Sequence, residues 1–137
     1  MAYWLFKTEP GTYAFEDLVK AKRAIWDGVA NPVAQKHLRS VAKGDGVIVY
    51  HTGSVRAAVG VAEITGPARP DPKQEKLVVV ELVAKERLAR PVGLDEIKAS
   101  PLFADSPLVK IGRLSVVPLD AAQWKALHTL AKRRAAE

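Results

Sequence analysis

The stretch Gly46-Val47-Ile48-Val49-Tyr50-His51-Thr52-Gly53 decides the fold, because it contains the clearest β-strand in the sequence. Val, Ile and Tyr are enriched in strands, and glycine-containing turns stand on both sides of this run. The next segment, residues 56–65, predicts another strand. Gly60 in its middle indicates a bulge or a close approach by another part of the chain. A β-sheet is therefore expected around the middle of the chain.

Toward the C-terminus the pattern predicts more strands and two helices. Residues 66–73 hold three prolines and predict a loop. Residues 77–83 are almost continuously apolar, which indicates a strand buried on both faces or in a barrel. An extension of that strand to residue 88 stays open. The elements expected beyond it are a helix at 94–99, an irregular segment at 102–112, a strand at 114–119 and a helix that Asp120 caps.

Toward the N-terminus the pattern alternates between strand and helix. The elements expected there are a strand at 3–7, a helix at 15–22, a short segment at 25–29 that ends in a turn, and a helix from Asn31-Pro32 to about residue 42. The resulting order, β-α-α-β-β-β-α-β-α, predicts an α+β domain. We expect a mixed sheet curled into a partial barrel, with the helices packed outside it.

Length and composition limit the class of protein. The 137 residues fit a single domain spanning 1–137. The absence of Cys excludes a disulfide scaffold, a thiolate zinc site and a Cys nucleophile. No apolar run approaches the length of about 18 residues that a membrane span needs, and the N-terminus lacks the pattern of a signal peptide. We therefore expect a soluble, cytoplasmic protein without a membrane partner, and favour a monomer.

The formal charge of +6 favours anionic partners such as nucleic acid. Residues 125–137 carry net +3 of this charge, so half of the excess lies near the C-terminus. We expect a basic tail at about 132–137, which adds affinity for anions or serves solubility alone. The remaining 124 residues also carry net +3, so the body of the chain is only mildly basic.

Catalytic and cofactor motifs are missing from the sequence. His37, His51 and His128 are far apart and form no metal-binding pair, and there is no phosphate-binding or dinucleotide-binding glycine motif. A triad of Ser115, His51 and Asp45 can be written down, but no nucleophile elbow supports it. The sequence predicts no metal and no cofactor.

Two aromatic residues stand beside polar, turn-forming segments. Trp26 precedes Asp27-Gly28, and Tyr50 precedes His51-Thr52-Gly53. One interpretation is that both rings fill the core, as we expect for Phe6, Phe15 and Trp124. The other is a base-binding pocket, in which an aromatic face stacks on a base and fixed polar groups read its edge.

Five motifs in the same order resemble the EVE domain family, which includes the thymocyte nuclear protein 1 group. The resemblance covers residues 3 to about 130. The motifs are Trp4-x-Phe6-Lys7-Thr8-Glu9-Pro10, Trp26-Asp27-Gly28-Val29-x-Asn31, Val49-Tyr50-His51-Thr52-Gly53, Gly60-Val61-Ala62 and Arg113-Leu114-Ser115-Val116-x-Pro118. Position 30 departs from the pattern, with Ala where relatives often carry Arg.

The resemblance implies a PUA-like fold, a mixed β-barrel flanked by short helices and related to the YTH and ASCH domains. It also implies a reader of modified bases, with modified cytosine in DNA proposed for some members. Catalysis is not established for the family. We therefore expect a non-catalytic module that binds RNA or DNA and recognises a base, with a modified base favoured.

The matching motifs suggest which residues carry this function. The base-binding pocket is expected from Trp26 and Tyr50, which stack, and from Asn31, His51, Thr52 and Ser115, which read the base edge. Phosphate or polar contacts are expected from Lys7, Glu9 and Arg113. Two alternatives stay open: an enzyme acting on RNA or a nucleotide with His51 as general base, and an adaptor that binds protein.

Overall fold

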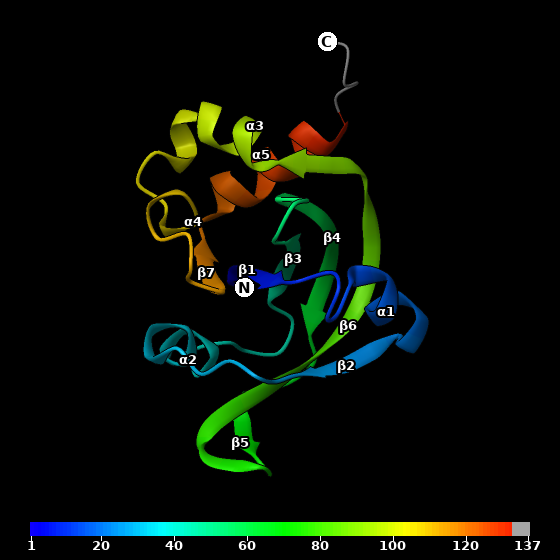
Figure 1. The fold of residues 1–137 in the computed structure, drawn as a ribbon, viewed down its shortest axis with the longest axis vertical. Coiled ribbons are helices and arrows are strands. Elements are labelled where there is room, and N and C mark those ends of the chain that lie inside the picture. Colours follow the sequence, from blue (N-terminus) through cyan, green and yellow to red (C-terminus); the bar gives the residue numbers. More distant parts are fainter. Residues whose placement is uncertain (133–137) are drawn as a thin grey trace.

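The computed structural model describes residues 1–132, and a curved sheet forms its centre (Figure 1). The strands are β1 (Tyr3–Thr8), β2 (Arg23–Trp26), β3 (Gly46–His51), β4 (Ala57–Ile64), β5 (Arg69–Asp71), β6 (Gln74–Gly93) and β7 (Val116–Leu119). Their order across the sheet is β2-β6-β4-β3-β1-β7, and β5 pairs with β6. The predicted basic tail lies outside the described residues, apart from Lys132.

The sheet is mixed, as predicted. The pair β1–β3 is parallel, and the other neighbouring strands are antiparallel. No pairing between β2 and β7 closes the sheet among the described residues, so it is a strongly curved open sheet rather than a complete barrel. The fold is otherwise the α+β arrangement expected from the sequence.

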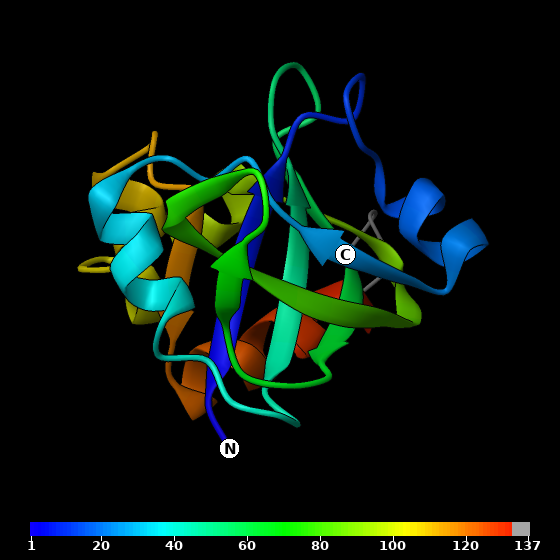
Figure 2. The same cartoon turned by 90° about the horizontal axis from the view of Figure 1, so that it is seen from below.

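Within residues 1–132, six short helices surround the sheet (Figures 1 and 2). They are α1 (Phe15–Ala21), α2 (Pro32–Leu38), α3 (Leu94–Ala99), the 3₁₀ helix η1 (Pro101–Phe103), α4 (Pro107–Lys110) and α5 (Ala121–Lys132). In Figure 1, α3 and α5 lie at one end of the sheet, and α2 lies toward the β5–β6 hairpin at the other.

The two helix caps predicted from the sequence are present. The Asn31 side chain accepts hydrogen bonds from the backbone N–H groups of Val33 and Ala34, and Pro32 occupies the first turn of α2. Asp120 accepts from the Gln123 backbone N–H at 2.7 Å, and the Gln123 side chain accepts from the Asp120 N–H at 3.0 Å. This reciprocal pair fixes the start of α5.

Gly60 lies at a bulge in β4, and another part of the chain packs closely against it. The pairing register shifts beside it between β4 and β6. The Phe15 ring of α1 packs directly on its Cα, and a Cβ built at Gly60 would lie 2.3 Å from Phe15 Cζ. Only glycine leaves room for α1 to lie this close to the sheet.

Four segments differ from the expectations. Residues 66–73 contain β5, which pairs with β6, and not only a loop. Residues 25–26 belong to β2, and the segment 102–112 contains α4 and part of η1. The strand expected at 77–83 is the 20-residue β6, whose outer parts carry charged, exposed side chains. Hydrogen bonding to a neighbouring strand, rather than apolar side chains, sets its length.

Candidate functional site

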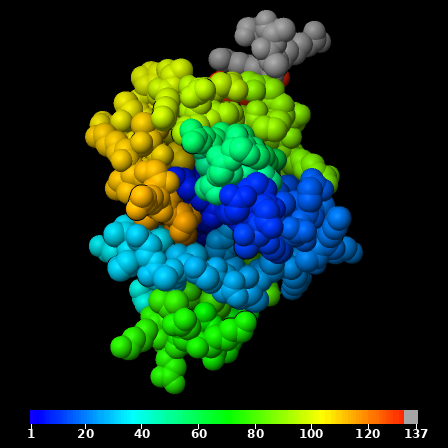
Figure 3. Space-filling view, viewed as in Figure 1, coloured from blue at the N-terminus to red at the C-terminus, as the bar shows by residue number. Residues whose placement is uncertain are grey.

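A hollow of about 540 Å³ opens where three strands end or begin. Its walls come from residues 7–9 at the end of β1, residues 12–13, residues 24–29 around the end of β2, and Ser115 just before β7. Figure 3 shows the surface hollowed between the blue segment after β1, the light blue segment around β2 and the orange segment before β7.

Trp26 and Tyr13 provide the aromatic part of this hollow. The Trp26 ring is buried and packs against Phe6, with ring centroids 5.6 Å apart. The half-buried Tyr13 ring meets Trp26 edge-on, at 6.1 Å and 85°. The structure therefore places a second aromatic ring beside Trp26, but it is Tyr13 and not Tyr50.

Tyr13 is held in place by the turn that follows β1. Its backbone N–H donates to the Glu9 carbonyl at 2.9 Å, and its own carbonyl accepts from the Thr8 hydroxyl at 2.7 Å. Burial, together with the negative charge of Asp17, raises the pKa of the Tyr13 hydroxyl. Tyr13 was not among the residues predicted from the sequence, although it stands in a Gly11-Thr12-Tyr13 turn of the kind that singled out Trp26.

Lys7 contributes a cation to the hollow. Its Nζ donates to the Gly112 carbonyl at 2.9 Å and lies 5.7 Å from the centre of the Tyr50 ring. Burial lowers the pKa of the Lys7 amine. The Ser115 carbonyl accepts from the Lys7 backbone N–H at 2.8 Å, which brings the segment before β7 against the end of β1.

Glu9 also lines the hollow, on the side of the β3–β4 loop. Its Oε1 accepts from the Gly11 backbone N–H at 3.1 Å. A Cβ on Gly53 would lie 2.6 Å from Glu9 Oε2, and Gly53 has a φ of +74°. Thr52 donates its backbone N–H to the Thr8 carbonyl at 2.9 Å. The β3–β4 loop is thus fixed against Glu9, and the Glu9 carboxylate is directed toward Gly11 rather than toward Lys7.

Five of the nine predicted site residues do not line this hollow. Tyr50 is buried beneath Lys7, and its hydroxyl pKa is raised, mainly by burial. Asn31 caps α2, and Arg113 is exposed in the loop next to Gly112. The residues outside the hollow are Asn31, Tyr50, His51, Thr52 and Arg113, and those that line it are Lys7, Glu9, Trp26 and Ser115.

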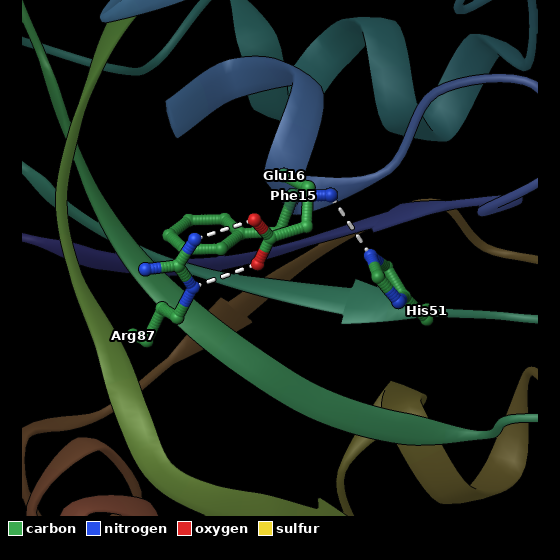
Figure 4. Close-up of polar contacts among 4 residues, drawn as sticks. All are labelled: Phe15, Glu16, His51 and Arg87. Atoms are coloured by element: carbon green, nitrogen blue, oxygen red, sulfur yellow. Dashed lines mark hydrogen bonds and ion pairs between the residues drawn. The ribbon is translucent and has the colours of Figure 1, made fainter. Parts of the chain in front are cut away.

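His51 holds the beginning of α1 to the end of β3 (Figure 4). Its Nε2 accepts the Phe15 backbone N–H at 3.0 Å, so its proton is on Nδ1. Burial lowers the His51 pKa, against the opposing effect of Glu9 and Glu16. The Glu16 carboxylate is paired with the Arg87 guanidinium of β6. Because Nε2 is engaged by the backbone, the nitrogen that would act as a general base is occupied.

Two other hollows of similar size lack this combination of groups. One of about 580 Å³ lies between α3 and α5 and is lined without an aromatic ring. Another of about 400 Å³ contains Tyr3 and Trp124, but these two rings stack on each other at 4.7 Å. The hollow beside Trp26 is therefore the candidate site.

Within residues 1–132, no three His, Asp or Glu side chains are grouped so that they would hold a metal ion. In the same range, no helix is both long enough and apolar enough to cross a membrane.

Comparison with known proteins identifies clear relatives. The EVE domain model matches residues 2–130. The NMR structure of Rpa0253 from Rhodopseudomonas palustris is 38% identical, with a TM-score of 0.90 over 96% of this chain and 93% of that one. A crystal structure from Pseudomonas putida is 31% identical, with a TM-score of 0.89 over 95% and 99% of the two chains. A search of curated proteins found no match.

More distant structures share the fold. Human THYN1, crystallised in complex with DNA that contains 5-methylcytosine, is 23% identical, with a TM-score of 0.88 over 98% of this chain and 99% of that one. This likeness confirms the PUA-like arrangement expected from the sequence. An ASCH protein from Zymomonas mobilis is 14% identical, with a TM-score of 0.58 over 93% of this chain and 97% of that one, and shares the fold alone.

Proposed function

Because the chain belongs to the EVE domain family, we propose that it is a non-catalytic module that binds nucleic acid and takes one base, preferably a modified base, into the hollow beside Trp26. The observation that carries this proposal is the meeting of two aromatic rings and a lysine amine in one hollow. The Lys7 amine and the rings of Trp26 and Tyr13 come from three separate segments of the chain.

The aromatic rings supply the affinity for a flat ligand. Stacking of a base on an aromatic side chain is worth about 1–3 kcal/mol. Taking a base out of a duplex costs a few kcal/mol, so an unpaired base is the easier ligand. The Trp26 and Tyr13 rings stand edge to face, so that a base lying against one ring meets the other at its side.

The polar groups of the hollow can distinguish one base from another. Lys7, Glu9 and Ser115 bring a cation, a carboxylate and a hydroxyl from the end of β1, the turn after it and the segment before β7. Residues 27–29 complete the wall beside Trp26. Such groups read the exposed edges of an unstacked base. The THYN1 complex with 5-methylcytosine DNA makes modified cytosine the first ligand to test.

Binding to matched oligonucleotides tests the proposal. The panel holds RNA and DNA single strands that carry one cytosine, one 5-methylcytosine, one adenine or one N6-methyladenine in the same context, measured by fluorescence anisotropy at low salt. We expect binding, with at least one modified base preferred over its unmodified form. No binding to any strand at low salt would contradict the proposal.

Two tryptophan variants locate the binding site. Trp26→Leu removes the ring in the hollow, while Trp124→Leu removes a partly buried ring that packs on Tyr3 elsewhere. Both variants lose packing, so each is used only after circular dichroism shows that it is folded. We expect at least a tenfold loss of affinity in Trp26→Leu and little change in Trp124→Leu, since about 1.4 kcal/mol corresponds to a factor of ten. Equal losses in both would contradict the assignment.

One variant separates this proposal from the enzyme reading. His51→Gln changes no residue that lines the hollow, and the Gln amide oxygen supplies an acceptor for the Phe15 N–H, so we expect this variant to bind as the unaltered protein does. Turnover of RNA or a nucleotide that is lost in His51→Gln while binding persists would show that the protein is an enzyme. Binding that does not weaken with salt would instead favour a protein partner.

A further inference from the structure

The positive charge of residues 1–132 is concentrated in two segments. Residues 28–44 carry three cationic side chains and no carboxylate, and residues 66–76 carry three cationic side chains and two carboxylates. Their net charge is +4, whereas the other described residues carry 13 basic and 12 acidic side chains. We call the six cations the basic surface: Lys36, Arg39, Lys43, Arg69, Lys73 and Lys76.

All six side chains of the basic surface are exposed, and none forms a salt bridge with a carboxylate of residues 1–132. Of the two carboxylates in the same segments, Asp71 is buried and accepts the Lys73 backbone N–H at 2.8 Å. It is directed into the hairpin turn. The charge on the basic surface is therefore available to an external anion.

The two segments lie side by side, although they are separated in the sequence (Figures 1 and 2). Arg39 Nη2 donates to the Lys76 carbonyl at 3.0 Å. The buried Gln35 amide of α2 accepts from the Val78 N–H at 2.9 Å and donates to the Val78 carbonyl at 3.1 Å. The Gln35 side chain thus pairs with β6 as a neighbouring strand would, and fixes α2 against the hairpin.

The same glutamine connects the basic surface to the hollow. Gln35 Nε2 also donates to the carbonyl of Val29 at 2.6 Å, and Val29 belongs to the wall formed by residues 24–29. In Figure 3, α2 (cyan) and the hairpin (green) are visible on the same face as the hollow, next to the light blue wall segment. A strand whose base enters the hollow therefore has the basic surface beside it.

Resting on the function proposed above, we infer that the basic surface binds the phosphate backbone of the nucleic acid next to the base in the hollow. Exposed Lys and Arg side chains contact phosphates without reading sequence, whereas contacts to the base edge specify the base. The two parts of the molecule then have separate tasks, with the hollow selecting the base and the basic surface adding affinity that salt weakens.

The test compares two triple variants with equal loss of charge. Lys36→Gln/Lys43→Gln/Lys73→Gln neutralises half of the basic surface. Lys85→Gln/Lys98→Gln/Lys125→Gln neutralises three exposed lysines outside it. The affinity of each protein for the preferred oligonucleotide of the panel and for its unmodified form is measured between 50 and 200 mM salt.

Each phosphate that a lysine or arginine contacts adds a fixed amount to the slope of log binding constant against log salt concentration. The amount is about −0.9 on duplex DNA and about −0.7 on single strands. If all three lysines contact phosphates of a single strand, the unaltered protein loses about 20-fold more affinity across this salt range than the basic-surface variant does. The ratio of affinities for the modified and unmodified base stays the same. The control variant keeps the slope of the unaltered protein.

The outcomes distinguish the two proposals. Equal salt slopes in all three proteins would overturn the inference about the basic surface and leave the base-binding hollow standing. If the salt slope falls by the same amount in both triple variants, the inference about the basic surface is also overturned, because net charge alone would then account for the effect. Failure of the unaltered protein to bind any oligonucleotide would overturn the proposed function itself.

Discussion

His51 shows how one side chain joins two elements next to the candidate site. Its imidazole accepts the first N–H of α1, which has no partner within the helix. The interaction requires a neutral ring, because a protonated imidazole has no acceptor. Protonation of His51 therefore opposes the attachment of α1, and with it the position of Tyr13, which lies two residues before the helix.

The pH dependence of stability tests this role. Burial lowers the His51 pKa below its ordinary value of 6.5, and it lowers the His37 pKa as well. As pH falls below about 6.5, the unfolded chain takes up protons that the folded chain does not, so the free energy of unfolding decreases. We expect a smaller decrease between pH 6.5 and 5 in His51→Gln, measured by urea unfolding. An identical decrease in both proteins would contradict the role assigned to His51.

Single residues were the least predictable part of the site. Lys7, Glu9, Trp26 and Ser115 were chosen from the sequence, and all four line the hollow. Asn31, His51 and Thr52 were chosen as polar side chains beside an aromatic residue, but the first two bond with the backbone of nearby helices. The sequence shows which residues are polar, but not whether the backbone of the same chain already uses them.

At the scale of elements, the contact between α1 and β4 decides how close the first helix lies to the sheet. The ring of Phe15 covers Gly60, with no space for a side chain between them. Since Tyr13 lies two residues before the start of α1, this contact also sets one wall of the hollow.

Adding a methyl group at Gly60 tests this contact. Gly60→Ala brings a Cβ into the Phe15 ring, and such overpacking costs about 1–3 kcal/mol of unfolding free energy. Gly66→Ala is the matched control, because a Cβ at that position meets nothing within 4 Å and the φ of Gly66 is not in the left-handed region. We expect a change within about 0.5 kcal/mol there. Equal effects of both variants in urea unfolding would show that α1 is not held as described.

The contacts of the Gln35 side chain lead to a second prediction about how the elements are held together. Gln35→Leu leaves the backbone groups of Val29 and Val78 without this partner, at a cost of about 1–3 kcal/mol for a buried group left unpaired. Gln123→Leu removes another buried glutamine, which bonds the Leu102 carbonyl far from the hollow. We expect both variants to unfold at lower urea, but only Gln35→Leu to bind oligonucleotides more weakly when folded. Equal weakening in both would contradict the link between Gln35 and the hollow wall.

The strands that the sequence missed are short edge segments. β2 and β5 have four and three residues, too few for an alternating pattern to be recognised. Both pair with β6, whose apolar middle was predicted but whose full length was not. Long-range pairing fixes these three strands together. By contrast, α2 and α5 begin at cap residues within a few positions, so their starts could be predicted locally.

At the scale of the whole molecule, the charge distribution changes the interpretation of the composition. By composition, half of the +6 lies in the C-terminal region and the rest of the chain is mildly basic. In the fold, residues 28–44 and 66–76 come together, and the average over the chain conceals a surface of six cations. The net charge of +6 favours an anionic partner, but only the tertiary arrangement indicates which surface such a partner would contact.

The indole N–H signals of the three tryptophans test the central claim most directly. In a ¹H–¹⁵N spectrum, each of Trp4, Trp26 and Trp124 gives one indole signal, and only Trp26 lines the hollow proposed to hold the base. Titration with a 5-methylcytosine oligonucleotide should shift the Trp26 signal strongly. The Trp4 indole, which donates to Asp45, and the Trp124 indole, which lines another hollow, should change little. A Trp26 signal that stays unchanged while the oligonucleotide binds would contradict the account.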